Sequence, residues 1–336
     1  MKTYKYTDAP LEVHGLPFFE QNHILERVPA EYREKLPNLA FLGRRCPGAR
    51  VCFRTDSPRF TVKIRMQSMT PDVGMSIFAC QAVNVLIGER ATARFAGLVN
   101  PPDYNTLTAE KTFSKSGEME DITLFLPRNE IVEELEISVE DGAEVASPTP
   151  YKYPPMLFYG SSITEGGCCC RVTNVYNAII SNHLDVDYYN YGFSGSAKGE
   201  PEMAELINKI PMSIFVLDYD HNSPSAEHLA NTHEPFFRAI REKNPTLPII
   251  IMSKPDFDYS PENAKRRDII RATYEHALAD GDNNVYFIDG QSFFGDNDRH
   301  FCTCDCCHPN DLGFYRMAQC VEPVVKHILE ERYPLI

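Results

Sequence analysis

The stretch Met156-Leu-Phe-Tyr-Gly-Ser-Ser-Ile-Thr164 opens with a short apolar run and passes through a glycine into serine and threonine residues. An apolar run of this length, bounded by a turn residue, is typical of a buried strand. Serine and threonine are preferred where a helix begins, and a helical pattern follows from Asn174. The stretch therefore predicts a strand, a sharp turn and a helix, which together form one β–α unit.

The same unit repeats along the rest of the chain. Five β–α repeats imply a parallel sheet with helices on both of its faces. We expect a flavodoxin-like, three-layer α/β/α domain with a five-stranded parallel sheet, whose functional residues lie at the carboxyl ends of the strands. The later strands are expected at Val186–Tyr191, Ile214–Leu217, Pro248–Met252 and Val285–Ile288, and the helices at Asn174–Leu184, Glu202–Lys209, Ala226–Lys243, Pro261–Ala279 and Pro309–Arg332.

The chain before this stretch has a different pattern. From about Arg50 to Glu140, short segments alternate apolar and polar residues, which is typical of strands with one exposed face. This pattern favours an N-terminal β-sandwich of jelly-roll type. Four prolines within residues 146–155 mark the junction, because proline continues neither a strand ladder nor a helix, and we expect domains at 1–148 and 149–336. The expected strands are Arg50–Thr55, Phe60–Met66, Ser76–Ile87, Ala93–Ala96, Asp121–Leu126 and Val132–Val139.

The net charge and the absence of long apolar runs limit the classes of binding partner and the location that we expect. The 336 residues carry a formal net charge of −14, which repels phosphate backbones and anionic lipids, so nucleic acid and membrane partners are disfavoured. A neutral substrate, such as an uncharged ester or an acylated sugar, is not disfavoured. No apolar run approaches the ~20 residues of a transmembrane helix. Because the first residues also lack the apolar core of a signal peptide, a cytoplasmic location is expected.

Three residues at the ends of expected strands have side chains that could react together. Ser162 lies where the amides of a following helix favour developing negative charge. Asp305 and His308 are three residues apart, so the carboxylate can face the imidazole. A carboxylate on Nδ1 fixes the histidine tautomer and leaves Nε2 free to take a hydroxyl proton. Each residue alone could be a helix cap or a surface residue, but together they indicate a triad in which Ser162 attacks an ester.

Two further residues lie between these motifs. Gly195 follows the second strand of the expected sheet, and Asn222 follows the third. The amide of a glycine and the side-chain amide of an asparagine at neighbouring strand ends could donate to one oxyanion, together with the amide of Ser162. Taken singly, Gly195 is typical of a turn and Asn222 of a helix cap. The order of all the motifs favours an oxyanion hole.

This arrangement resembles the SGNH (GDSL-like) hydrolases, which are serine esterases. The resemblance rests on Tyr159-Gly-Ser-Ser-Ile-Thr-Glu-Gly-Gly-Cys168 and Cys307-His-Pro-Asn-Asp-Leu-Gly-Phe314 and extends from about Pro155 to the C-terminus. It looks like one subgroup with an N-terminal β-sandwich, similar in layout to carbohydrate esterases that deacetylate sugars. The resemblance implies hydrolysis of a small-molecule or oligosaccharide ester with no cofactor. The positions that match the family's motifs are Ser162, Gly195, Asn222, Asp305 and His308.

Some alternatives stay open at this level. Ser161 stands where the family usually has an aspartate and is a second candidate nucleophile, although the register against Gly160 and Ile163 favours Ser162. The sandwich could bind sugar beside a non-catalytic hydrolase domain, or it could simply wall one side of the cleft. A longer acyl chain, as in a lipase substrate, is also compatible with these motifs.

Cysteines crowd both ends of the expected triad. The chain has 11 cysteines, an odd number that favours free thiols, and they cluster at Cys168–Cys170 and Cys302–Cys307. Their spacing is not that of a structural zinc site, and a metal on His308 would remove the base, so a metal site is disfavoured. Nearby, His221 is expected at the surface and Arg171 in a surface salt bridge.

Overall fold

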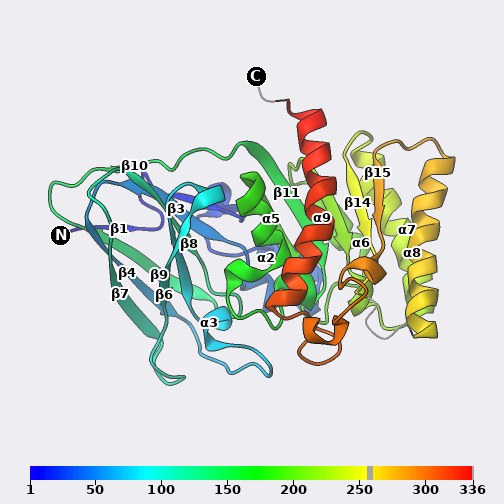
Figure 1. The fold of residues 1–336 in the computed structure, drawn as a ribbon, viewed down its shortest axis with the longest axis horizontal. Coiled ribbons are helices and arrows are strands. Elements are labelled where there is room, and N and C mark those ends of the chain that lie inside the picture. The colour runs from blue at the N-terminus through cyan, green and yellow to red at the C-terminus, as the bar shows by residue number, and fades with distance from the viewer. Residues whose placement is uncertain (256–259, 335–336) are drawn as a thin grey trace.

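The two periodicities of the sequence correspond to two arrangements of strands in the computed structural model, which describes residues 1–255 and 260–334 (Figure 1). The N-terminal part contains two antiparallel sheets. The four-stranded sheet has the order β1 (Lys2–Lys5), β9 (Val132–Val139), β4 (Arg59–Met66) and β7 (Thr108–Ser114). The other has the order β10 (Val145–Ala146), β3 (Arg50–Thr55), β8 (Glu120–Phe125), β5 (Val83–Ile87) and β6 (Arg94–Val99), with β2 (Glu12–His14) paired to β3.

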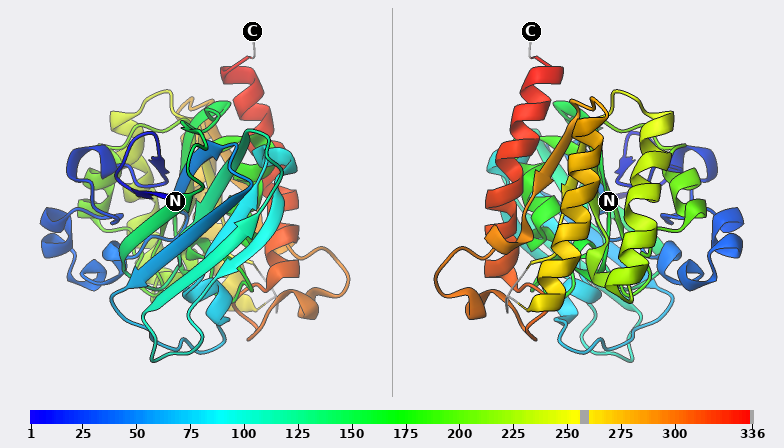
Figure 2. Two further views of the ribbon diagram at one scale, coloured as in Figure 1. Left: turned by 90° about the vertical axis from the view of Figure 1, so that its left-hand side faces the viewer. Right: turned by 90° about the vertical axis from the view of Figure 1, so that its right-hand side faces the viewer.

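The two antiparallel sheets enclose one apolar core, as the alternating sequence predicts. Along β4, the side chains of Phe60, Val62 and Ile64 are buried, whereas the intervening Lys63 is exposed. Phe60 packs edge-on against Phe53 of β3, with ring centroids 6.2 Å apart. Because these rings come from different sheets, the contact joins the two layers, and the expected sandwich is confirmed (Figure 2).

The strands expected in the sandwich differ from the structure at two places. The expected strand Ser76–Ile87 begins as helix α3 (Ile77–Cys80), because the hydroxyl of Ser76 accepts a hydrogen bond from the amide of Phe78 and caps that helix. Strand β7 was not predicted, because only Ala109 and Phe113 of its seven residues are buried, which leaves too few inward positions for a clear period of two.

The first 45 residues, whose sequence gave no prediction, connect the two parts of the molecule. After contributing β1 and β2 to the sandwich, they form α1 (Phe19–Asn22), α2 (Ala30–Lys35), η1 (Pro37–Leu39) and η2 (Leu42–Arg44). Val28, Tyr32 and Leu39 are buried in a cluster with Leu206 and Ile207 of the C-terminal part. Residues 28–39 therefore pack on the C-terminal part, although they lie in the sequence between the sandwich strands β2 and β3.

The C-terminal part is a five-stranded parallel sheet with helices on both faces. Its order is β12–β11–β13–β14–β15, so the expected flavodoxin-like three-layer domain is confirmed. Alternate residues of β11 face opposite layers: Phe158 packs with α5 and α9, and Tyr159 packs with α6 and α7. The bounds are β11 (Tyr153–Gly160), β12 (Val186–Gly192), β13 (Phe215–Asp218), β14 (Ile249–Met252), β15 (Val285–Ile288), α4 (Ser162–Glu165), α5 (Tyr176–Leu184), α6 (Pro201–Ile207), α7 (Ala226–Lys243), α8 (Pro261–Ala279), α9 (Asp311–Arg332), η3 (Arg90–Thr92), η4 (Val172–Asn174), η5 (Asp220–Asn222), η6 (Gly290–Ser292) and η7 (Arg299–Cys302).

Three prolines lie in other structural positions than the sequence predicted. Pro154 and Pro155 lie inside β11 rather than in a linker, at a point where the register to β12 shifts between Tyr153 and Met156. Such irregularities are where a strand tolerates proline. Pro309 does not begin the last helix, because Asn310 caps α9 by accepting from the amide of Gly313. The division at 148/149 stays a prediction.

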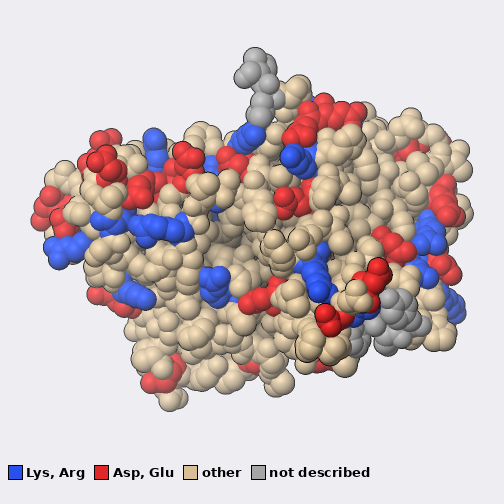
Figure 3. All heavy atoms as spheres, viewed as in Figure 1, with Lys and Arg blue, Asp and Glu red and all other residues tan. Residues whose placement is uncertain are grey.

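The surface carries charges of both signs. On the face seen in Figure 3, Asp and Glu are interspersed with Lys and Arg. In the part of the chain that the structure describes, no helix combines the length and the apolar character needed to cross a membrane.

Candidate active site

Three neighbouring strands end side by side and bring their following loops together. In the parallel register, Gly160 of β11 pairs with Gly192 of β12 on one side and with Asp218 of β13 on the other. Ser162, Gly195 and Asn222 follow these three strand ends by two to four residues. All three line one cleft of about 510 Å³, and the segment before α9 closes it with Asp305 and His308.

The two serines after β11 have different environments. Ser161 is fully buried, and its Oγ accepts the amide hydrogen of Ile163 at 3.1 Å, so it serves as the cap of α4. Ser162 is the first residue of α4, and its Oγ lies 2.8 Å from Nε2 of His308. Ser161 already uses its hydroxyl within the turn, so this geometry favours Ser162 as the nucleophile.

Asp305 is hydrogen-bonded to His308 on the side of the ring opposite Ser162. Its Oδ2 lies 2.7 Å from Nδ1 of the imidazole, and its Oδ1 accepts hydrogen bonds from the backbone amides of His308 at 2.7 Å and Cys307 at 3.0 Å. Burial alone would raise the pKa of Asp305, but these hydrogen bonds and the charge of His308 outweigh it and hold that pKa below its usual value. Asp305 is therefore an ionised acceptor at neutral pH.

Other aspartates at strand ends are occupied elsewhere. Asp218 accepts from Thr164 and Tyr176, Asp220 pairs with Arg266, and Asp289 pairs with Arg271. None of these three carboxylates contacts His308 among the described residues. Asp305 is thus the carboxylate that the fold offers to the histidine.

The expected oxyanion donors converge on the same cleft. Gly195 has φ = +67°, a conformation that favours glycine. Asn222 is not the cap of α7, because Ser225 accepts from the amide of His228 there. One hydrogen of the Asn222 side-chain amide goes to the carbonyl of Phe193 at 2.7 Å, which leaves its second hydrogen for an oxyanion. Within residues 1–255 and 260–334, the amides of Ser162 and Gly195 have no hydrogen-bond acceptor, as an oxyanion hole requires.

Two side chains, those of His221 and Arg171, are not where the sequence predicted them. His221 lines the cleft instead of the open surface, and its Nδ1 lies 3.6 Å from Sγ of Cys307. Burial, helped by the nearby Lys254 and His308, lowers its pKa well below the usual value, so the ring is neutral. Arg171 is not in a salt bridge among the described residues; it bonds Asn174 and lies 3.9 Å from the ring centroid of Phe95.

None of the eleven cysteines of the chain forms a disulfide in this structure. One ligand atom each of Cys168, Asp305 and His308 lie within 4.8 Å of one another, a spacing that a metal ion could bridge. Both ring nitrogens of His308 are already hydrogen-bonded to Ser162 and Asp305. A metal on His308 would therefore displace one of the two bonds that the triad needs.

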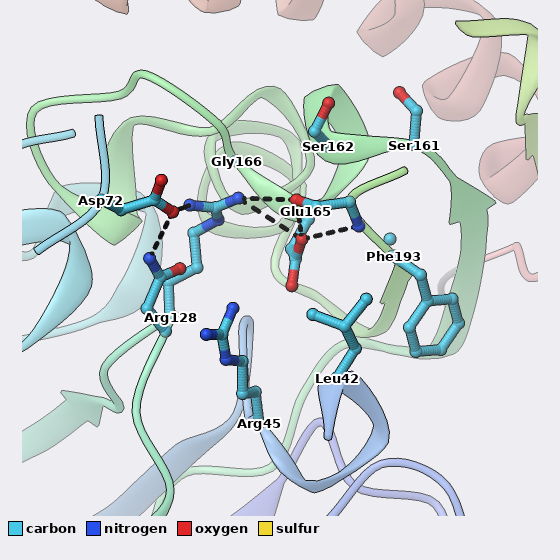
Figure 4. Close-up of polar contacts among 12 residues, drawn as sticks. Leu42, Arg45, Asp72, Arg128, Ser161, Ser162, Glu165, Gly166 and Phe193 are labelled. Atoms are coloured by element: carbon cyan, nitrogen blue, oxygen red, sulfur yellow. Dashed lines mark hydrogen bonds and ion pairs between the residues drawn. The ribbon is translucent and has the colours of Figure 1, made fainter. Parts of the chain in front are cut away.

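A buried charge network beside the cleft was not found from the sequence. The carboxylate of Glu165, in the last position of α4, is fully buried and pairs with Arg128 and Arg27. In Figure 4, Arg128 and Arg45 point toward this carboxylate. The only sequence signal was Glu165 itself, a charged residue within the otherwise apolar or small stretch Tyr159–Cys168.

Asp218 should make the stability of the protein depend on pH. Burial raises its pKa to about 7. The folded protein thus binds this proton more tightly than the unfolded chain, and the contribution of Asp218 to the free energy of unfolding should fall from about pH 4 to about pH 7 by about 1.4 kcal/mol per pH unit, then level off. The amide oxygen in Asp218→Asn can still accept from Thr164 and Tyr176, so urea unfolding should show the variant gaining stability over the wild type as pH rises from about 5 to 7. A difference that stays constant over this range would contradict the assignment.

Comparison with known proteins shows the family of this chain. Residues 153–326, just over half of the chain, match the GDSL-like lipase/acylhydrolase family. The chain belongs to this family. Residues 1–145 match the N-terminal region of SGNH-hydrolase-type esterases, so the GDSL-like chain resembles its relatives in both parts. Membership supports a hydrolase of acyl esters in general terms. A search of curated proteins found no match.

Solved structures show the same two-part fold. A GDSL-like lipase from Bacteroides ovatus is 26% identical, with a TM-score of 0.87 over 98% of both chains. The salicylyl-acyltransferase SsfX3 of a tetracycline biosynthetic pathway is 20% identical, with a TM-score of 0.80 over 98% of this chain and 99% of that one. A family two carbohydrate esterase from Clostridium thermocellum, in complex with cellohexaose, is 15% identical, with a TM-score of 0.62 over 84% of this chain and 93% of that one. The last two likenesses concern the fold alone.

Proposed function

We propose that this GDSL-like protein is a serine esterase that hydrolyses an acyl ester through an acyl-enzyme. The observation that carries the proposal is the unbroken chain from Ser162 Oγ to His308 Nε2 at 2.8 Å and from His308 Nδ1 to Asp305 at 2.7 Å. Nucleophile, base and orienting carboxylate are within hydrogen-bond reach of one another, which is the geometry that activates a serine.

The reaction takes two steps. His308 accepts the proton of Ser162 as the serine oxygen attacks the ester carbonyl, and the same histidine then donates that proton to the leaving alcohol. The amides of Ser162 and Gly195 and the side chain of Asn222 stabilise the oxyanion of the tetrahedral intermediate. In the second step, His308 deprotonates a water that attacks the acyl carbonyl. The bond from that carbonyl to Ser162 Oγ then breaks, His308 returns the proton to Oγ, and the acid is released.

We further propose O-acetyl groups on a carbohydrate as the substrate class. The family match supports an acyl ester, and the cleft opens between the sandwich loop Asp72–Met75 and the segment that carries His308, leaving room for an alcohol larger than a simple alkyl group. The overall negative charge also favours a neutral alcohol over a phosphorylated one.

A fluorophosphonate probe tests the activated serine directly. We expect stoichiometric labelling of the wild-type protein at the peptide that contains Ser162, because only a serine with a bound base reacts at neutral pH. Labelling at Ser161 or the absence of labelling would each contradict the assignment. Hydrolysis of acetylated sugars should be compared with that of nitrophenyl esters of rising chain length. A preference for chains of eight or more carbons over acetyl would reject the substrate class and leave the triad intact.

A further inference from the structure

Glu165 holds the loop that carries the oxyanion donor Gly195. Its Oε2 accepts a hydrogen bond from the amide of Ser194 at 2.9 Å and another from the hydroxyl of the same residue. Gly192, at the end of β12, makes this contact possible, because a Cβ there would lie 2.1 Å from the amide nitrogen of Glu165. The far side of the loop is fixed by Asn222, which donates to the carbonyl of Phe193.

The groups that hold Glu165 come from the N-terminal part of the chain. Arg128, three residues after β8, donates from Nη2 to the carboxylate at 3.3 Å and to the hydroxyl of Ser194 at 3.0 Å (Figure 4). Arg27 approaches the other carboxylate oxygen at 3.5 Å and donates to the carbonyl of Gly192 at 2.6 Å. Its guanidinium also lies 4.4 Å from the ring centroid of Phe193. Both arginines and Glu165 are buried.

This pairing keeps Glu165 charged inside the protein. Burial alone would raise its pKa, but the charges of Arg128 and Arg27, with the hydrogen bond from Ser194, outweigh burial and hold the pKa below its usual value. An ionised carboxylate is a stronger hydrogen-bond acceptor for the Ser194 amide than a neutral group. Without the arginines, a buried carboxylate would take up a proton or reorient.

We propose that Arg128 and Glu165 are positioning residues of the oxyanion hole, so that the sandwich domain completes the catalytic site. The inference rests on the proposed esterase function. Arg128 fixes Glu165 and Ser194, and Ser194 fixes the peptide from which the Gly195 amide points into the cleft. A displacement of that donor by about 1 Å is enough to lower turnover strongly. Arg128 also lines the cleft, but in this proposal the sandwich contributes to catalysis through the contacts of Arg128 with Glu165 and Ser194.

The test compares Arg128→Met with a matched control. Arg90 is also a buried arginine of the N-terminal part that pairs with a carboxylate of the α/β/α domain, but its partner Asp185 lies at the opposite end of β12. The readouts are kcat and KM for a small neutral acetyl ester, the inhibition constant of phenylboronic acid and Tm. The boronate forms a tetrahedral adduct on Ser162 that needs the oxyanion hole.

We expect Arg128→Met to lower kcat by about 10- to 100-fold with KM within about twofold, and to weaken boronate inhibition by a similar factor. Arg90→Met should lower Tm yet leave kcat within about twofold. Ser194→Ala keeps the hydrogen bond from its backbone amide to the carboxylate of Glu165 and leaves no buried charge unpaired. We expect it to fold and to lower kcat by up to about tenfold. Its effect should not add fully to that of Arg128→Met, because both act on one loop.

Other outcomes would overturn the proposal. A rise in KM with unchanged kcat would make Arg128 a substrate contact instead. Equal losses of kcat in Arg128→Met and Arg90→Met would mean that Arg128 contributes only to the stability of the fold. An unchanged inhibition constant of phenylboronic acid would mean that Arg128 does not position the oxyanion hole. If the wild-type protein neither hydrolysed esters nor bound the boronate, the proposed function itself would fail, and this inference with it.

Discussion

Replacing Ser162 with alanine is expected to lower kcat for any accepted ester by about 10⁵- to 10⁶-fold, roughly 7–8 kcal/mol of transition-state stabilisation. The variant keeps the amide of residue 162 as an oxyanion donor but has no oxygen to attack the carbonyl. His308 then has no hydroxyl proton to accept. KM should change little, because the small hydroxyl adds little to substrate binding. Steady-state kinetics with a nitrophenyl acetate assay would measure the loss.

Ser161→Ala is the matched control for this prediction. The residue is the immediate neighbour and has the same side chain, but its hydroxyl caps α4. Loss of such a cap costs about 1 kcal/mol of stability, so we expect a lower Tm with kcat within about tenfold of wild type. If instead Ser161→Ala were inactive and Ser162→Ala active, the nucleophile would have to be reassigned.

The parallel sheet could be predicted from the sequence because its strands are buried on both faces. Val285–Ile288 and Ile249–Met252 are short apolar runs, and each precedes or follows a long helical pattern. Strand β7 was missed because five of its seven residues are not buried. No helix or strand could be predicted in the first 45 residues for another reason. Their apolar side chains, such as Tyr32 and Leu39, pack on the C-terminal part. Because these contacts are made with residues distant in the sequence, the apolar positions do not recur with the period of a helix or a strand.

The candidate site shows the same contrast between local and distant information. Ser162, Asp305 and His308 were predicted because they lie in short motifs at strand ends, where parallel sheets gather functional residues. The pairs that position the oxyanion loop are different. Arg128 and Glu165 are 37 residues apart in the chain, and Arg27 and Glu165 are 138 apart. No motif links them, so only the packing of the two domains reveals that they meet.

Asp305→Asn is expected to lower kcat by about 10⁴-fold while leaving the fold intact. The orientation of the new side chain follows from its neighbours. The oxygen that replaces Oδ1 is held by the backbone amides of His308 and Cys307, which can only donate. The amide nitrogen must therefore face Nδ1 of His308. Nδ1 then has to accept a hydrogen bond, and the ring proton moves to Nε2.

A histidine in that tautomer cannot accept the proton of Ser162, so the expected loss is in kcat, with KM nearly unchanged. Asp311→Asn is the control, because Asp311 accepts a hydrogen bond from the backbone amide of Cys170 at 2.9 Å, which an asparagine oxygen can also do. Its kcat should stay within about twofold of wild type. Should Asp305→Asn keep more than a tenth of wild-type activity, the carboxylate would not set the tautomer, and Ser162 and His308 would have to act as a dyad. The two backbone bonds to Oδ1 make this a decisive test, because they leave the asparagine no productive orientation.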